Sequence, residues 1–181
     1  MPGRSPLRRS AAGTIIAVFA AIVLVADQCV KHATITFLPP QEVVPVWGRV
    51  FQLYYVRNSG AAFSIGSEIT WLFTLALAAV AIIIIWKSLA VRSRLWAVVL
   101  GVLLGGVLGN LTDRLFRQPG FGVGHVVDML SLPWLMPAIF NVADIFIVTG
   151  MISVALMIIL GLQLDGTRAH HESEASAEHP E

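Results

Sequence analysis

Four long stretches of the chain contain no charged residue and are mostly apolar. They cover residues 10–26, 69–86, 95–112 and 145–164, and a charged residue bounds each of them at both ends. Because a helix needs about 20 apolar residues to cross the hydrocarbon core of a membrane, each stretch is long enough for one span. A β-barrel would require alternating polar and apolar residues, which these stretches lack. The pattern predicts an all-α membrane protein with four transmembrane helices.

The predicted spans divide the chain into one compact domain and a tail. We place the spans at residues 10–32, 69–87, 94–114 and 140–164, with two long loops at 33–68 and 115–139. Residues 1–165 then form a single four-helix domain. Residues 166–181 are polar and without periodicity, which is typical of a disordered extension.

The composition agrees with a membrane protein and excludes several other classes. Of 181 residues, 56% are hydrophobic and 13% are charged, and the mean hydropathy is +0.78. The 12 basic and 11 acidic residues leave a formal net charge of +1, so we expect no nucleic-acid partner. With Cys29 as the single cysteine, the chain forms no internal disulfide.

The basic residues predict which side of the membrane each loop occupies. An even number of spans places both termini and the short loop 88–93 on one side, and cytoplasmic loops carry an excess of lysine and arginine. That side holds Arg4, Arg8, Arg9, Lys87, Arg92, Arg94 and Arg168. The other side holds Lys31, Arg49, Arg57, Arg114 and Arg117. We therefore expect cytoplasmic termini, a cytoplasmic tail and two long loops outside.

Polar residues gather at the outer ends of the predicted helices. They occur at residues 27–31, 110–114 and 141–144, and the outer loops add Asn58 and Asp128. An ionisable side chain inside a span costs about 2.5 to 3.5 kcal/mol on insertion scales, so several of them together usually mark a function. The inner ends of the helices have no comparable group.

Sequence spacing separates acidic residues with a neighbouring cation from those without one. Asp27 and Lys31 stand four residues apart in the orientation that favours an ion pair on a helix, which makes a purely structural role as probable as a functional one. Arg114 adjoins Asp113 and lies four residues after Asn110, so we expect it to have local partners. Asp128 and Asp144 have no cation nearby in the sequence, which makes them the candidates for chemistry.

A structural explanation exists for Asp144 but does not extend to Asp128. A carboxylate at the start of a helix interacts favourably with the helix dipole, and Asn141, three residues earlier, is a favoured N-cap residue. Alternatively, Asn141 shares a helix face with Asp144 and orients its carboxylate for catalysis. Two carboxyls held close together share one proton and thereby supply an acid and a base, as in aspartic proteases.

Two further patterns concern packing and the first outer loop. Gly101, Gly105 and Gly109 repeat every four residues beside Gly106, which allows helices to approach closely in lipid. Residues 41–46 and 50–56 alternate and predict a small β-hairpin or cradle, followed by a turn at Asn58 and Gly60. We also expect a short amphipathic segment at residues 61–68. An interfacial aromatic belt is expected to contain Tyr54, Tyr55, Trp71 and Trp134.

Several blocks of the sequence together resemble the signal peptidase II family, the bacterial membrane aspartic proteases also called lipoprotein signal peptidases. The blocks are GGVLGNLTDR at 105–114, GHVVD at 124–128, FNVAD at 140–144, RNSGAAFS at 57–64, and Asp27-Gln28 with Lys31. They occur in the family's order on a four-helix frame. Met129 and the long link at residues 117–123 depart from the usual pattern.

The resemblance implies a function and assigns roles to residues. It implies an endopeptidase of the bacterial cytoplasmic (inner) membrane, with its site at the outer face, that removes the signal peptide from diacylglyceryl-modified prolipoproteins just before the lipidated cysteine. Asp128 and Asp144 match the catalytic residues, with no metal or other cofactor. Positions that hold the site or the substrate are matched by Asn58, Gly60, Asn110, Arg114, Asn141, Asp27 and Lys31. We expect a β-cradle on the membrane surface and a monomer in the phospholipid bilayer.

The rival hypothesis is a small proton-coupled membrane carrier that uses the same aspartates as a proton relay. Carriers place their ionisable groups near the middle of the membrane, next to broken helices. Here these groups lie at one end, and the middles of the second and fourth spans are apolar. The absence of His-Glu-x-x-His and Gly-x-Ser-x-Gly motifs disfavours a zinc protease or a serine hydrolase.

Overall fold

The computed structural model describes residues 7–60 and 69–168 and contains four long helices in this part of the chain. They are α1 (Arg9–Phe37), α2 (Thr70–Ser88), α3 (Arg94–Phe116) and α4 (Val142–Ile159), and each is long and apolar enough to cross a membrane. The prediction of a helical membrane protein with four spans is confirmed. α1 continues five residues beyond the expected end at residue 32, whereas α4 covers only the middle of the expected range 140–164.

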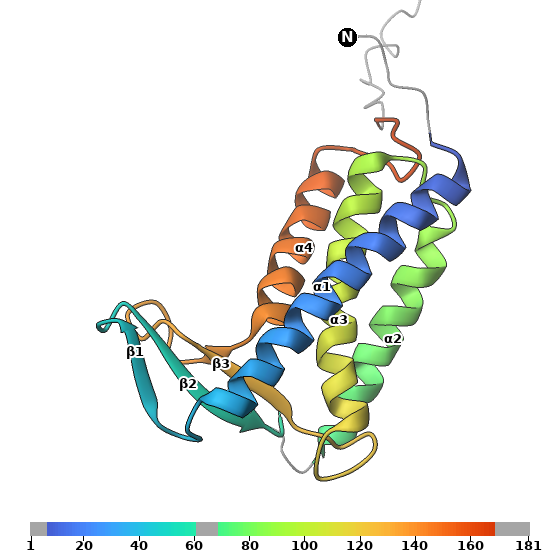
Figure 1. Cartoon of the computed structure of the whole chain (residues 1–181). Coiled ribbons are helices and arrows are strands. Elements are labelled where there is room, and N and C mark those ends of the chain that lie inside the picture. The colour runs from blue at the N-terminus through green and yellow to red at the C-terminus, as the bar shows by residue number, and fades with distance from the viewer. Residues whose placement is uncertain (1–6, 61–68, 169–181) are drawn as a thin grey trace, which may run out of the picture.

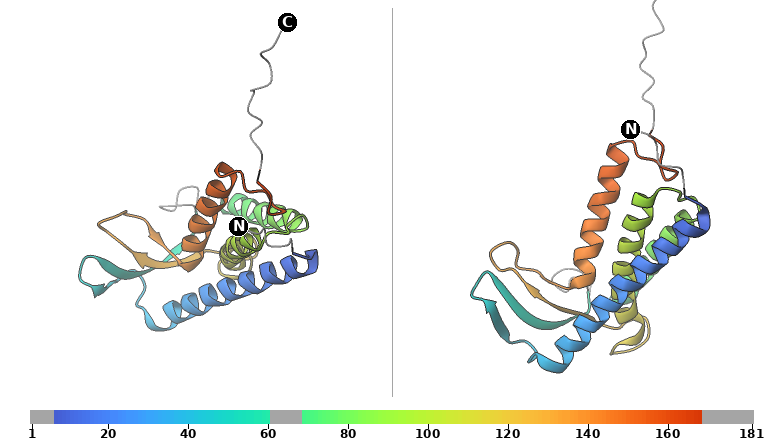
Figure 2. Two further views of the ribbon diagram at one scale, coloured as in Figure 1. Left: turned by 90° about the horizontal axis from the view of Figure 1, so that it is seen from above. Right: turned by 45° about the horizontal axis from the view of Figure 1, so that its top comes forward.

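Helix α3 forms the centre of the bundle. α1, α2 and α4 each pack against it, and Figure 2 shows α3 enclosed by the other three helices when the bundle is viewed along its length. The small residues of α3 permit this approach: a Cβ added to Gly105 would lie 2.7 Å from the carbonyl oxygen of Ala20 in α1. One added to Gly106 would lie 2.7 Å from that of Ala143 in α4. The glycine pattern therefore has the packing role that the sequence predicted.

A four-stranded antiparallel sheet lies at one end of the bundle (Figure 1). Its strands, in spatial order, are β1 (Val43–Trp47), β2 (Phe51–Asn58), β3 (Val126–Ser131) and β4 (Ile139–Phe140). The hairpin of β1 and β2 matches the alternation in the first outer loop. β3 and β4 come from the second loop and were not predicted, because β3 is buried on both faces over its first four residues and so lacks alternation.

The outer region and the start of the C-terminal segment contain features that the sequence did not predict. Tyr55 is only 4% exposed and packs in the sheet against Val127 and Met129. The prediction that Tyr55 belongs to an interfacial aromatic belt was therefore wrong. The amphipathic segment expected at 61–68 lies outside the described residues. The disordered tail expected at 166–181 stays a prediction, because most of it lies outside the described residues. At its start the backbone N–H of Gly166 donates to the carbonyl of Gln163, and residues 162 and 168 form a bridge.

Candidate active site

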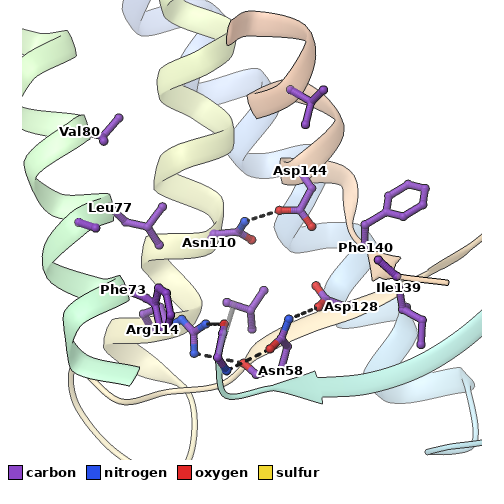
Figure 3. Close-up of a pocket in the computed structure, with 15 residues that line it drawn as sticks. Asn58, Phe73, Leu77, Val80, Asn110, Arg114, Asp128, Ile139, Phe140 and Asp144 are labelled. Atoms are coloured by element: carbon purple, nitrogen blue, oxygen red, sulfur yellow. Dashed lines mark hydrogen bonds between the residues drawn. The ribbon is translucent and has the colours of Figure 1, made fainter. Parts of the chain in front are cut away.

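Asp128 and Asp144 reach the same pocket from different elements. Asp128 lies in the middle of β3, Asp144 lies in the first turn of α4, and both line a pocket of about 450 Å³ between α2, α3, α4 and the sheet. Figure 3 shows the two carboxyls on the pocket side of their elements, with Asn110 and Asn58 beside them. The two carboxylates that sequence spacing left without a local cation are therefore neighbours in space.

Asn141 connects the two carboxyls directly. Its backbone N–H donates to Oδ2 of Asp144 over 3.0 Å, and its side-chain Nδ2 donates to Oδ1 of Asp128 over 2.6 Å. Its Oδ1 accepts from the backbone N–H of Asp144, which completes a capping box at the start of α4. The N-cap role that the sequence suggested for Asn141 is present. Its side-chain amide donates to Asp128 and not to Asp144, whose carboxyl accepts from the backbone N–H of Asn141 instead.

Each carboxyl has a second amide donor on its other oxygen. Asn110 Nδ2 donates to Oδ1 of Asp144 over 2.8 Å, and Asn58 Nδ2 donates to Oδ2 of Asp128 over 3.0 Å. All four carboxyl oxygens thus accept an N–H, so neither side chain can rotate without losing hydrogen bonds. The arrangement fixes the direction of the carboxyls toward the pocket.

The environment of Asp128 favours its protonated form at higher pH than usual. The residue is only 2% exposed, and this burial, followed by the nearby charge of Asp144, raises its pKa to about 7. The amide donors Asn58 and Asn141 act in the opposite direction but do not cancel these effects. The pair can therefore hold one proton near neutral pH, as two adjacent carboxyls are expected to do.

Asp27 and Lys31 lie behind the pocket in an ionic cluster with Asp113, and these three side chains are completely buried. Lys31 Nζ lies 2.9 Å from Oδ2 of Asp27, 2.9 Å from Oδ2 of Asp113 and 2.9 Å from Oδ1 of Asn110. Asp27 in turn accepts the backbone N–H of Ala143 at the start of α4. The predicted pair of Asp27 and Lys31 exists, and it joins α1 to α3 and α4 and supports Asn110.

Sequence reasoning missed the rest of this cluster. Asp113 also accepts from Arg117 and from the backbone N–H of Val127, while Gln28 donates to Asp27, Asp113 and the carbonyl of Gly109. The spacing of Asp113 and Arg117, four residues apart, was the available signal for their ion pair. The cluster of Asp27, Lys31, Asp113 and Arg117 contains two charges of each sign.

The partners of Arg114 are not its neighbours in the sequence. No ion pair of Arg114 with Asp113 is present in the described part of the chain, and its guanidinium instead donates to backbone carbonyls. The acceptors are Asn58, Ser59, Gly60 and Gly124. The backbone N–H of Gly60 donates to Oδ1 of Asn58, which completes the turn. Arg114 thereby holds the chain that presents Asn58 to Asp128.

The wall of the pocket opposite the carboxyls is apolar. α2 contributes Phe73, Leu77 and Val80, and Ile139 and Phe140 of β4 lie nearer to the carboxyls (Figure 3). No sequence pattern indicated that α2 lines the site, because its residues form a nearly uniform apolar run. Among the described residues, no group of three His, Cys, Asp or Glu side chains is arranged to hold a metal ion.

The fold and the site define a class: a polytopic membrane protein whose buried carboxyl pair lies in a half-apolar pocket at one end of its helix bundle. Comparison with known proteins identifies the family. A family model described as signal peptidase (SPase) II matches residues 19–160, so the chain belongs to the signal peptidase II family, which consists of membrane proteases.

Individual relatives agree with the family model. The lipoprotein signal peptidase of Leifsonia xyli subsp. xyli is 48% identical over 171 residues, covering 93% of this chain and 79% of the relative. The lipoprotein signal peptidase of Mycobacterium tuberculosis H37Rv is 41% identical over 152 residues, covering 84% and 74%. A solved bacterial membrane enzyme structure is similar with a TM-score of 0.71 and 26% identity, covering 81% of this chain and 88% of that chain.

Proposed function

We propose that this protein is an aspartic endopeptidase that removes the signal peptide from diacylglyceryl-modified prolipoproteins and cuts just before the lipidated cysteine. The observation that carries the proposal is that Asn141 donates one hydrogen bond to Asp128 and one to Asp144, and that both carboxyls line one pocket. The names of the relatives, which are lipoprotein signal peptidases, support the class of substrate.

The proposed reaction uses the shared proton of the carboxyl pair. The ionised carboxyl takes a proton from a water molecule, and the water oxygen attacks the carbonyl carbon of the scissile peptide bond. The protonated carboxyl gives its proton to the carbonyl oxygen, which forms a tetrahedral gem-diol. As this intermediate collapses, the carboxyl that took the proton from water gives it to the leaving nitrogen, and the C–N bond breaks. One hydroxyl of the gem-diol returns its proton to the other carboxylate as the new carboxyl product forms, so the pair again holds one proton.

The buried polar residues act as positioning groups in this proposal. Asn58, Asn110 and Asn141 hold the carboxyl oxygens, while Arg114 and Gly60 fix the turn that presents Asn58. Asp27 and Lys31 act one step further away, because Lys31 holds Asn110. The mechanism requires no metal or other cofactor, since the carboxyl pair supplies both the base and the acid.

The apolar wall from α2 suits a lipid-bearing substrate. An acyl chain or the apolar segment of a signal peptide could lie against Phe73, Leu77 and Val80 while the peptide bond meets the carboxyls. We propose that the protein works as a monomer in the bacterial cytoplasmic membrane, with cytoplasmic termini and the site at the outer face. The distribution of basic residues and the outer-leaflet position of a lipidated substrate support this orientation.

The test is cleavage of a diacylglyceryl-modified prolipoprotein peptide by the purified full chain in lipid, with a chelator present throughout. We compare the parent with Asp128→Asn and Asp144→Asn. Asp165→Asn serves as the matched control, because Asp165 is an exposed acid after the end of α4, away from the pocket. The expected result is cleavage by the parent and the control, and loss of nearly all activity in both pocket variants.

Other outcomes would contradict the proposal. Near-parental turnover by Asp128→Asn or Asp144→Asn would remove that residue from the chemistry. Failure of the parent on a substrate that a characterised signal peptidase II cleaves would contradict the assigned substrate. Cleavage by the parent that occurs only when the chelator is left out would contradict a reaction that depends on the two carboxyls without a metal.

A further inference from the structure

A second pocket lies on the opposite face of the strands that form the candidate active site. It encloses about 310 Å³ between the ends of α1 and α3 and the strands β2 and β3. Side chains alternate along a strand, and Arg57 pairs in register with Val127. Asn58 and Asp128 face the candidate active site, so Arg57 and Val127 face this second pocket, and both line it.

The second pocket is rich in hydrogen-bond donors whose capacity is only partly used. Arg57 donates through Nε to the hydroxyl of Tyr55, and no ion pair of Arg57 is present within residues 7–60 and 69–168. Arg117 donates to Asp113 and Gln28 through Nε and Nη2. Gln118 and His125 also line the pocket. Arginine guanidinium groups in this arrangement match the geometry of a phosphate.

The electrostatic balance around the pocket is positive. Asp27 and Asp113 are balanced by Lys31 and Arg117, so the charge of Arg57 has no acidic counterpart among the described neighbours. His125 responds to this field: burial first, and then the charges of Arg114 and Arg57, lower its pKa. Its ring is therefore neutral at neutral pH and is still able to donate one hydrogen bond.

The pocket lies where the helices leave the membrane. α1 has 29 residues, which corresponds to about 43 Å of helix and exceeds the roughly 30 Å hydrocarbon core. Its last turns, with Ile35 in the pocket, therefore reach the level of the lipid headgroups. Phe116 borders the pocket and is 76% exposed, which offers an apolar contact for acyl chains. Figure 1 shows the end of α1 beside β2 and β3.

We propose that this pocket binds the phosphate group of an anionic phospholipid, with Arg57 as its principal contact and Arg117 and His125 as additional donors. The headgroup then lies behind β2 and β3, while its acyl chains pass Phe116 into the bilayer. The site is separate from the carboxyl pocket, since the sheet lies between them.

The test measures lipid binding to the full chain, purified in a neutral detergent and titrated with phosphatidylglycerol or phosphatidylcholine, by native mass spectrometry. The parent is expected to bind one phosphatidylglycerol at least about tenfold more tightly than phosphatidylcholine, because both lipids offer a phosphate but only phosphatidylcholine also brings a cationic group next to the positive pocket. Arg57→Gln should lose this preference. Arg49→Gln is the matched control: it makes the same charge change in the turn between β1 and β2, outside the pocket.

A third variant and a competing anion sharpen the test. Arg57→Lys keeps the charge but not the planar pair of donors, so its preference should lie between those of the parent and Arg57→Gln. Equal losses in Arg57→Gln and Arg49→Gln would indicate general surface attraction and overturn the proposal. Displacement of the lipid by equimolar inorganic phosphate would show that the pocket selects a free anion, and would overturn the lipid assignment.

Discussion

The buried Lys31 offers the sharpest test of how this membrane protein holds its site. Its ammonium group is completely buried and contacts Asp27, Asp113 and Asn110. Lys31→Met keeps most of the side-chain length and apolar surface but removes the charge. Asp113 then keeps its ion pair with Arg117, whereas Asp27 loses the cation with which it pairs in the described part of the chain, so one buried negative charge is left uncompensated.

The structure sets the size of the expected effect. Removing one partner of a buried ion pair costs about 3 to 5 kcal/mol, because the remaining charge stays buried without compensation. For a chain of this length, each kcal/mol lowers Tm by about 2 to 4 °C, so Lys31→Met should lower Tm by about 6 to 20 °C. Cleavage activity should also fall, because Asn110 loses one of the two donors to its Oδ1, Lys31 and Asn141, and so positions Asp144 less firmly.

Thermal unfolding of the purified protein in detergent measures this effect. Lys87→Met is the control, because Lys87 is exposed at the other end of the bundle, where its ammonium group lies over the ring of Trp86. It should change stability by less than about 1 kcal/mol. The double variant Lys31→Met with Asp27→Asn restores the charge balance and should recover part of the loss. A Tm of Lys31→Met equal to that of Lys87→Met would refute the reasoning.

Three further predictions concern the carboxyl pair, its connecting residue and the helix contacts. Because the pKa of Asp128 is raised to about 7, the pair holds its shared proton below that pH and loses it above. The value of kcat/KM should therefore fall as pH rises through about 7. A kcat/KM that stays constant up to about pH 9 would contradict the shared proton. Asn141→Ala should lower kcat by about tenfold or more and stability by about 1 to 2 kcal/mol, measured by cleavage and thermal unfolding, because it removes both the cap and the link. Gly109→Ala should destabilise the protein by about 1 to 3 kcal/mol, because the added Cβ would lie 2.6 Å from Oδ2 of Asp27. Gly13→Ala should instead stabilise the helix by about 0.5 to 1 kcal/mol, because its added Cβ would meet no atom within 4 Å.

The local features of this protein were accessible from its sequence. The four spans follow from uninterrupted apolar runs, because lipid leaves few alternatives to a helix. The close contacts of Gly105 and Gly106, the pair of Asp27 and Lys31, and the cap formed by Asn141 all depend on spacings of three or four residues within one helix. Asp128 and Asp144 stood out because neither has a cation nearby in the sequence.

Other features depend on which distant segments meet. Local partners were expected for Arg114, but its long side chain reaches the carbonyls of residues 58–60, over 50 positions away. The strand β3 lacks alternation because both of its faces are covered, so burial hid the strand that carries Asp128. The apolar wall from α2 was equally invisible, since a uniform run does not indicate which face meets a pocket.

The sequence by itself determined the membrane-spanning helices, the packing of small residues and the identity of the candidate acids, because these follow from local periodicity and from the cost of charge in lipid. Only the tertiary structure decided that β3 pairs with β2, which brings Asp128 to Asn58 and, through Asn141, to Asp144. The paired residues of β2 and β3 are 68 to 79 positions apart in the chain, and such pairing is chosen by the total fit of the fold. No local pattern encodes it, and the geometry of the carboxyl pair depends on it.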